Sequence, residues 1–277
     1  MTAQREFQFT DRDFRCLQRL VARHTGITLS PAKRDMLYSR LARRLRALGL
    51  RRFKEYCSLL QEDGHGEELR HFTNAVTTNL TAFFREPHHF DYLREEFLPA
   101  MMERRAQVRR LRIWSAGCST GEEPYSIAIT LADAVPPEWD VRILATDLDS
   151  NVLDRARRGI YSEERTAEVP ERLKRKWFLR GRGENRDKVR VRRELRDMIR
   201  FRQLNLMHEW PMRGPFDAIF CRNVIIYFDK PTQSRLMDRF ADILADDGRL
   251  FLGHSETLYR VTDRFQLLGR TIYRKVP

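Results

Sequence analysis

The 277-residue sequence lacks a hydrophobic run long enough to cross a membrane. Its longest stretch without Asp, Glu, Lys or Arg is the 14 residues 71–84, whereas a spanning helix needs about 18. Residues 1–10 contain no apolar core, so we expect no export signal. The four cysteines form no CxxC pair, which argues against a disulfide framework and a structural zinc site. These absences predict a globular protein of the cytoplasm.

Acidic residues are the minority among the charges. The chain has 39 Asp and Glu against 52 Lys and Arg, a net charge of +13. Such an excess indicates an acidic partner but does not choose among nucleic acid, an anionic membrane surface and an acidic protein face. The excess is strongest in residues 33–54, where nine basic residues accompany the single acid Asp35. This segment is either a solvated face or a docking surface for an acidic partner.

Helical signals fill residues 1–80. Thr10 and Asp13 have the spacing of a capping box, and Gly26 is placed to end the helix that follows. A second apolar stripe has helical spacing and consists of Leu37, Leu41, Leu45 and Leu48. Two further amphipathic stretches complete what we expect to be a helical bundle with short connections.

After Pro99 the pattern changes to alternating strands and helices. Short apolar strands are expected at 111–114, 141–145, 216–221 and 249–253. The alternating order predicts an α/β fold, in which helices cover both faces of a mostly parallel sheet. Residues 161–200 differ, because Val189, Arg190 and Val191 alternate with a period of two, and we expect a small antiparallel insert there.

A glycine-rich turn and an acid follow the first two of these strands. Gly117 and Gly121 lie between a strand and a helix, and Asp147 ends the next strand, where its carboxylate can accept ribose hydroxyls. The pattern indicates a nucleoside-cofactor site, although an ordinary tight turn with a surface Asp is the alternative. Glu122 and Glu123 at the helix start would repel a pyrophosphate and suit a cationic amino acid group. They favour S-adenosylmethionine over NAD.

Longer strings carry a more specific resemblance. They are TNLTAFFRE at 78–86, SAGCSTGEEPYS at 115–126, TDLD at 146–149, FCRNVIIYFDK at 220–230 and GHSE at 253–256. Together they resemble the CheR family, the chemotaxis receptor methyltransferases, and the resemblance covers essentially the whole chain. It implies transfer of a methyl group from S-adenosylmethionine to receptor glutamate side chains, which leaves S-adenosylhomocysteine and requires no metal. The products are glutamyl methyl esters for sensory adaptation in bacteria.

The resemblance also implies an organisation and a set of site residues. The domains are a helical domain at 1–80, a linker at 81–98 and a Rossmann-like methyltransferase domain at 99–277, with the β-subdomain at about 161–200. The residues that correspond to the family's cofactor site are Asn79, Thr81, Arg85, Glu122, Asp147, Asn205, Leu206, Arg222 and Asn223. Arg85 and Tyr227 correspond to residues near the transferred methyl group.

The chemistry agrees with these residue types. A glutamate carboxylate is ionised at neutral pH because its unperturbed pKa is about 4.3, so no general base is needed. Arg85 can orient the carboxylate through its fork of donors, shared with the Tyr227 hydroxyl. We expect Asp147 to hold the ribose and Glu122 to contact the methionine ammonium. Asn205 and Leu206 are expected to frame the adenine.

Two other functions are kept as alternatives. A nucleic-acid methyltransferase would suit the net charge, but the turn at 222–225 lacks the prolines of amino-group methylases, and Phe220 rather than Pro precedes Cys221. A non-catalytic adaptor would need a degraded cofactor motif, yet the motif residues are present. We therefore expect a monomer that binds neither nucleic acid nor the membrane interior. Segment 33–54 would meet the receptor's acidic helices, and the β-subdomain could hold a receptor C-terminal peptide.

Overall fold

The computed structural model describes residues 5–62 and 66–276. By its internal contacts the chain divides into two compact units. The first consists of Met1–Thr78 with Tyr227–Asp229, and the second of Asn79–Ile226 with Lys230–Pro277. Within residues 5–62 and 66–276, each helix is too short or too polar to span a bilayer.

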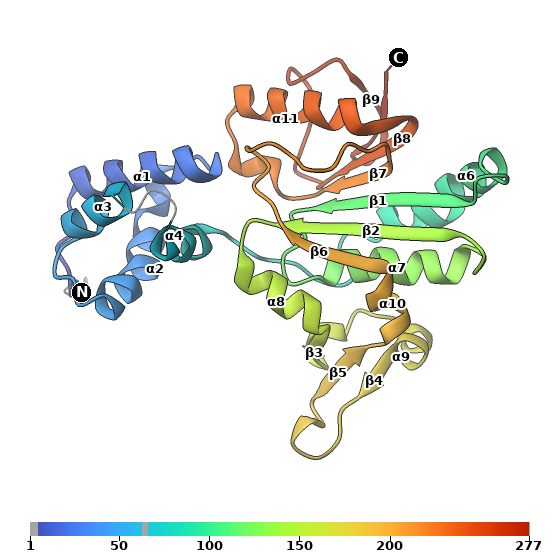
Figure 1. Ribbon diagram of the computed structural model, residues 1–277, viewed down its shortest axis with the longest axis horizontal. Helices are drawn as coiled ribbons and strands as arrows, with labels where there is room; N and C mark the ends of the chain where they lie inside the picture. Colours follow the sequence, from blue (N-terminus) through green and yellow to red (C-terminus); the bar gives the residue numbers. More distant parts are fainter. Residues whose placement is uncertain (1–4, 63–65, 277) are drawn as a thin grey trace. The chain divides into compact units, whose positions relative to one another are not determined.

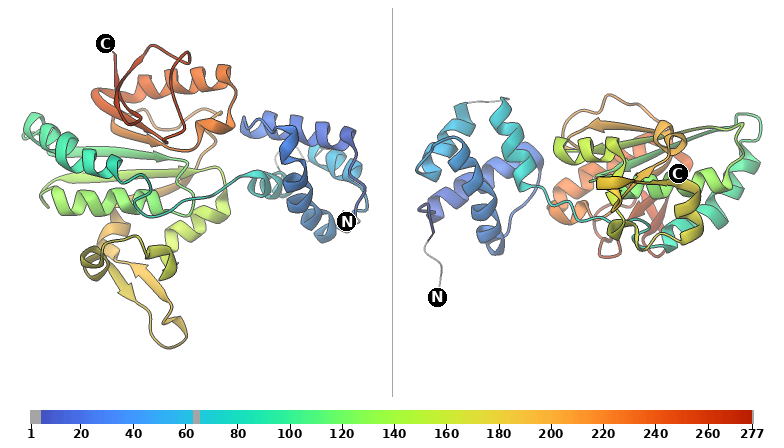
Figure 2. Two further views of the ribbon diagram at one scale, coloured as in Figure 1. Left: turned by 180° about the vertical axis from the view of Figure 1, so that it is seen from behind. Right: turned by 90° about the horizontal axis from the view of Figure 1, so that it is seen from below.

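The first unit is helical, as predicted (Figure 2). Its helices are α1 (Asp11–Thr25), α2 (Arg34–Ala47), α3 (Phe53–Glu62) and α4 (Glu67–Val76). The capping box is confirmed, because the Thr10 hydroxyl accepts a hydrogen bond from the Asp13 backbone N–H and the Asp13 carboxylate accepts one from the Thr10 backbone. Gly26 ends α1 in the left-handed conformation, with φ 75°. Leucines and aromatic rings from all of these helices form one buried cluster.

The second apolar stripe is confirmed at three of its four positions. Leu37, Leu41 and Leu45 are fully buried, but Leu48 is 38% exposed. The predicted fourth position was wrong because α2 ends at Ala47, so Leu48 caps the helix and does not belong to its buried face. Before α2, Ser30 and Pro31 open a 3₁₀ turn, Pro31–Lys33.

The second unit is built on a seven-stranded sheet in the order β6-β2-β1-β7-β8-β10-β9 (Figure 1). β1, β2, β6, β7 and β8 pair in parallel, while β10 runs antiparallel to both of its neighbours. The predicted mostly parallel sheet is therefore confirmed. The strands are β1 (Arg110–Ala116), β2 (Asp140–Asp147), β6 (Ile199–Gln203), β7 (Phe216–Cys221), β8 (Leu244–Leu252), β9 (Phe265–Gly269) and β10 (Ile272–Lys275).

Helices cover both faces of this sheet. Neighbouring residues of a strand point to opposite faces, and in β1 Ile113 joins the apolar cluster that contains α7. The next residue, Trp114, meets the Phe240 ring of α11 at 5.2 Å between ring centroids. The helices are α5 (His88–Tyr92), α6 (Leu98–Arg104), α7 (Glu122–Ala134), α8 (Ser150–Arg158), α9 (Glu171–Trp177), α10 (Arg193–Met198) and α11 (Lys230–Ile243). A π-helical turn, Leu93–Phe97, joins α5 to α6.

The predicted antiparallel insert is a second, three-stranded sheet, drawn in yellow in Figure 1. Its strands are β3 (Ile160–Ser162), β4 (Phe178–Arg180) and β5 (Lys188–Val191), in the order β3-β5-β4. β6 begins at Ile199, inside the range assigned to the insert, and belongs instead to the main sheet, parallel to β2. Its sequence alternates buried and exposed residues as an edge strand does, so the pattern alone resembled that of the insert.

Candidate functional site

Most of the predicted cofactor residues of the second unit lie at or after the carboxyl ends of β1, β2, β6 and β7; Asn79, Thr81 and Arg85 precede β1. Parallel strands bring these ends to one edge of the sheet, where α/β proteins bind their ligands. The loop after β1 carries Gly117 and Gly121, β2 ends at Asp147, and Arg222 directly follows β7. Asn205 and Leu206 follow β6. The fold thus gathers at one edge residues that are more than 100 positions apart in the sequence.

The turn after β1 requires its glycines. Gly117 has φ +90°, and a Cβ there would lie 2.5 Å from a methyl carbon of Val224. Gly121 has φ +98°, and a Cβ there would lie 2.8 Å from the Cβ of Ala156. The Gly117 backbone N–H donates to the Thr146 carbonyl at 2.8 Å, which ties the turn to the end of β2. A larger residue at either glycine would displace this loop.

Asp147 ends β2, and its carboxylate is already oriented by hydrogen bonds, one of them from the loop after β1. Its oxygens accept the backbone N–H groups of Ser119 at 2.8 Å and Asp149 at 2.9 Å. Burial raises the pKa of Asp147 to about 6, although these backbone hydrogen bonds favour the ionised form. The Asn79 side-chain amide donates to the Asp149 carboxylate at 2.9 Å, and the Asn79 backbone carbonyl accepts from the Ser119 hydroxyl at 3.0 Å. Asn79 and Asp147 are therefore brought together, as a shared cofactor site requires.

Glu122 is fully buried at the start of α7 and is paired within the protein. One carboxylate oxygen accepts from the Thr120 hydroxyl at 2.6 Å, and the other pairs with Arg165 at 2.7 Å. Arg165 comes from the 3₁₀ turn Glu164–Thr166 after β3, so this pair connects the β-subdomain to the glycine turn. The predicted contact of Glu122 with a ligand ammonium stays a prediction.

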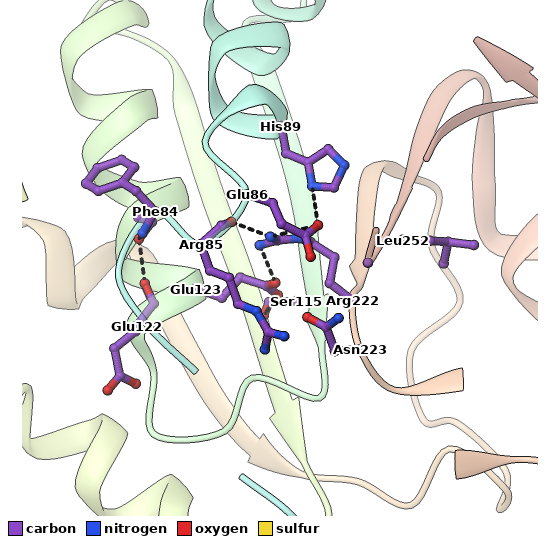
Figure 3. Close-up of polar contacts among 12 residues, drawn as sticks. Phe84, Arg85, Glu86, His89, Ser115, Glu122, Glu123, Arg222, Asn223 and Leu252 are labelled. Carbon is purple, nitrogen blue, oxygen red and sulfur yellow. Dashed lines mark hydrogen bonds and ion pairs between the residues drawn. The ribbon is translucent and has the colours of Figure 1, made fainter. Parts of the chain in front are cut away.

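Arg222 is the centre of a buried ion network (Figure 3). Its guanidinium lies 3.1 Å from the Glu123 carboxylate and 3.3 Å from that of Glu86, and it donates to the backbone carbonyl of Arg85. The Ser115 hydroxyl donates to the other oxygen of Glu123 at 2.7 Å. Burial raises the pKa of Glu123, while the charge of Arg222 opposes that shift. The described contacts of the Arg222 side chain are thus with protein groups rather than directed toward a ligand.

Glu86 also receives contacts from two histidines. His254 donates from Nδ1 at 2.7 Å and from its backbone N–H at 3.2 Å. Burial alone would raise the pKa of Glu86, but these hydrogen bonds and the Arg222 charge lower it to about 2. His89 lies 3.6 Å away from Glu86, and burial together with Arg222 lowers the His89 pKa to about 3. Glu86, His88 and His89 could bring ligand atoms within 4.8 Å of one another, but the Arg222 guanidinium opposes a metal cation there.

Asn223 adopts a left-handed conformation, φ 58°, directly after Arg222. Its backbone N–H donates to the buried Glu256 at 2.7 Å, and the same carboxylate accepts from the N–H groups of Val224 at 2.9 Å and Gly253 at 2.6 Å. Glu256 therefore holds the loop after β7 in place. The sequence contained the string around Glu256, but nothing in its spacing indicated this role.

The remaining predicted residues lie as follows. Asn205 accepts from the Met207 backbone N–H at 2.9 Å, and Leu206 is 8% exposed. Thr81 is half-buried, and Arg85 donates from its guanidinium to the Leu80 carbonyl at 3.0 Å. Tyr227 ends the 3₁₀ turn Ile225–Tyr227 and groups with the first unit. The catalytic role of Tyr227 therefore stays a prediction. Phe83 and Cys221 are buried core residues.

Comparison with known proteins identifies the family of this chain. Residues 12–77 match the family described as "CheR methyltransferase, all-alpha domain", and residues 79–274 match "CheR methyltransferase, SAM binding domain". The chain is 48% identical over 274 residues to Chemotaxis protein methyltransferase 2 of Pseudomonas aeruginosa, covering 97% of this chain and 94% of that one. It is 46% identical over 268 residues to Chemotaxis protein methyltransferase of Escherichia coli (strain K12), covering 95% and 91%. The chain belongs to the CheR family of S-adenosylmethionine-dependent methyltransferases.

Proposed function

We propose that this protein methylates glutamate side chains of chemotaxis receptors and forms glutamyl methyl esters. The observation that carries the proposal is the similarity to chemotaxis protein methyltransferases over both the helical and the cofactor-binding parts of the chain. Receptor glutamates are the acceptors that the sequence resemblance implies. The chemistry of the site supports a carboxylate acceptor.

Methyl transfer to a carboxylate requires little acid–base catalysis by the protein. The cofactor supplies a methyl group on a positively charged sulfonium, which leaves as a neutral thioether when the carboxylate oxygen takes the methyl group. No proton is transferred, because the glutamate is already ionised. The protein has to align the reacting groups and exclude water. Arg85 is the residue we assign to the incoming carboxylate, because its planar guanidinium can donate to both oxygens. Tyr227 is the second residue that we assign to the reaction, as the sequence resemblance implies.

The residues around the glycine turn fit the cofactor. The Asp147 carboxylate is anchored by two backbone N–H groups and suits the ribose hydroxyls. We assign the adenine to Asn205 and Leu206, and we assign the amino acid end to the region of Glu122. Asn79, Thr81 and Asn223 complete the set of predicted cofactor contacts. Arg222 belongs to it through its backbone position, since its guanidinium is bound to protein groups.

The partner surface that we propose is the basic segment 33–54. Several of its arginines pair within the first unit, including Arg34 with Asp11 at 2.6 Å and Arg44 with Glu68 at 2.5 Å. Arg43 and Arg51 are exposed and are better candidates for contact with acidic receptor helices. The β-subdomain is a second candidate, for a receptor C-terminal peptide. We propose that the protein acts in the cytoplasm as a monomer.

The test measures transfer from methyl-labelled S-adenosylmethionine to receptor-containing membranes, with total RNA as a second acceptor. Label that mild alkali releases as methanol identifies a carboxyl methyl ester. We expect such label on the receptor and not on a receptor in which the accepting glutamates are changed to alanine. The Asp147→Ala enzyme is the matched control, since it should lose cofactor binding and leave both acceptors unlabelled.

Other outcomes select the alternatives. Alkali-stable label on RNA would overturn the proposal in favour of a nucleic-acid methyltransferase, with segment 33–54 as its phosphate-binding surface. If neither acceptor is labelled although S-adenosylmethionine binds in a titration, the glutamate proposal fails for that receptor and a different acceptor must be sought. Absence of both binding and transfer would favour a non-catalytic adaptor.

A further inference from the structure

The turn that carries Arg85 has an unusual backbone. Phe84 and Glu86, on either side of Arg85, adopt left-handed conformations with φ 52° and 57°. Residues with a side chain seldom do so, because the left-handed conformation brings the side chain close to the backbone and costs free energy. The cost is met only where the surroundings hold the backbone in place. Two left-handed residues around one arginine therefore indicate a conformation that the rest of the site enforces.

Three consecutive residues of this turn are anchored to three different elements. The Phe84 backbone N–H donates to the Ser126 hydroxyl of α7 at 2.9 Å. The Arg85 carbonyl accepts from Arg222 at the end of β7, as Figure 3 shows. The Glu86 carboxylate accepts from His254, which follows β8. These anchors fix the backbone on both sides of Arg85, and the Arg85 guanidinium itself donates to the Leu80 carbonyl at 3.0 Å.

The central anchor is the Arg222 guanidinium, and burying its charge costs free energy. Arg222 is 6% exposed and is shared by the carboxylates of Glu86 and Glu123. Burying charges costs more desolvation free energy than a surface pair would, so such networks are a poor source of net stability. Their benefit is fixed geometry. Here the fixed atom is the carbonyl of Arg85 itself.

We propose that Glu86 and Arg222 are positioning residues, which aim the Arg85 guanidinium at the methyl acceptor by holding the strained turn 84–86. Neither residue needs to touch the substrate. The inference rests on the proposed role of Arg85 toward the incoming carboxylate. It assigns to the Arg222 side chain a function apart from cofactor contact.

The first test compares Glu86→Gln with Asp217→Asn. Asp217 is a buried carboxylate near the start of β7, at the other end of the strand from Arg222, and it pairs with Arg105. Both changes remove one buried negative charge from an ion pair. We expect Glu86→Gln to lower kcat by about 10- to 100-fold, the loss expected from misplacing a reacting group by ~1 Å, with KM for S-adenosylmethionine nearly unchanged. Asp217→Asn should keep kcat within about twofold of the wild type, even if its melting temperature falls as much as that of the Glu86→Gln variant.

The second test asks whether Glu86 acts through Arg85. In an Arg85→Ala background, adding Glu86→Gln should lower kcat by no more than about twofold, because residues that act as a unit are not additive. Ser126→Ala removes an anchor without leaving a buried charge and should lower kcat by about three- to tenfold. If the Glu86→Gln variant does not fold, the kcat of the Ser126→Ala variant tests the proposal instead.

The outcomes separate this inference from the proposed function. If the wild-type enzyme forms no glutamyl ester, the proposed function fails and this role with it. If the wild type is active, the inference alone is overturned by any of three results: equal kcat for the Glu86→Gln and Asp217→Asn variants, the same fold loss from Glu86→Gln with and without Arg85, or unchanged kcat in Ser126→Ala.

Discussion

The two units of this chain allow ion pairs in different environments to be compared. Each unit contains both exposed and buried pairs, and one pair from each shows the contrast. In the helical unit the pair Arg52–Glu55 is open to water, with side chains 69% and 34% exposed. In the methyltransferase unit the Arg222 side chain is 2% exposed, and those of its partners Glu86 and Glu123 are 10% and 11% exposed. Exposed pairs contribute about 0–1 kcal/mol, whereas breaking a buried pair costs about 3–5 kcal/mol. The comparison teaches that a buried ion pair fixes the positions of the groups around it, whereas an exposed pair leaves its charges available to a binding partner.

The largest effect is expected from removing the buried cation. Arg222→Met should lower the free energy of unfolding by about 3–5 kcal/mol, because Glu86 and Glu123 would remain buried without their counter-charge. Arg52→Met should change it by no more than about 0.5 kcal/mol. Denaturant titration followed by circular dichroism measures both. Equal losses in the two variants would contradict the distinction between the units.

A second prediction sharpens the comparison from inside the helical unit. Glu68 is 9% exposed, accepts from the Tyr56 hydroxyl at 2.7 Å and pairs with Arg44, so it resembles the buried network more than its neighbours. Glu68→Ala should cost about 2–3 kcal/mol, because it leaves a buried hydroxyl and a guanidinium without their acceptor. The measurement is hydrogen exchange of the backbone amides of α3 and α4.

The matched control is Glu67→Ala on the same helix. Glu67 has a side chain that is 76% exposed and pairs with Arg70 at 3.1 Å. Its loss should change exchange protection by less than about 0.5 kcal/mol. If the two variants lose the same amount of exchange protection, burial does not decide how much an ion pair contributes to the stability of this unit.

Much of the fold could be predicted because its signals are local. The Thr10–Asp13 capping box and the strand 216–221, which is apolar except for Asp217, each lie within a few residues, and both formed as predicted. β6 was missed because its alternating pattern fits an edge strand of either sheet. Leu48 was misassigned because periodicity does not show where a helix ends.

Candidate site residues could be named from the sequence, but the network that connects them could not. Asp147 could be named because it ends a recognisable strand, whereas Arg222 was named only through the resemblance to the CheR family. The contacts of Arg222 with Glu86 and Glu123 join positions far apart in the chain, so no spacing in the sequence reveals them. The pairing of Glu122 with Arg165 was missed for the same reason.

A third prediction concerns pH and the buried acid of the cofactor site. Asp147 has a pKa raised to about 6 by burial, and only its ionised carboxylate can accept two ribose hydroxyls. Protonation therefore competes with the ligand, and affinity for S-adenosylhomocysteine should fall about fivefold between pH 6 and pH 5, because the ionised fraction falls from about one half to about one tenth. It should be nearly constant above pH 7. Calorimetric titration across this range measures it.

The Asp147→Asn variant is the control for that titration. It should bind weakly and lose the pH dependence, because no proton competes at the amide. Stability of the free protein should carry the opposite sign, since burying the ionised carboxylate costs free energy above about pH 6, and this cost falls progressively as the pH drops from about 6 to about 4. A wild-type affinity that is flat from pH 5 to pH 7 would exclude Asp147 as the ribose acceptor.

The smallest effect on the protein itself is expected on the exposed basic surface. Reversing Arg43 and Arg51 to Glu should leave unfolding within about 0.5 kcal/mol of the wild type, because both side chains are exposed. If segment 33–54 docks on acidic receptor helices, KM for the receptor should rise about fivefold at low salt. Arg44 is left unchanged, because its pairing with the buried Glu68 would confuse docking with folding.

The control for this surface reverses Arg12 and Arg15 on α1, which are also exposed and change the net charge by the same amount. If long-range attraction to an acidic receptor were the whole effect, both double variants would raise KM equally, and the difference would vanish at high salt. A rise confined to the Arg43 and Arg51 variant locates the docking face on the basic segment. An unchanged KM in both would mean that the exposed charge of the helical unit plays no part in substrate binding, and the contrast between the units would rest on buried charge alone.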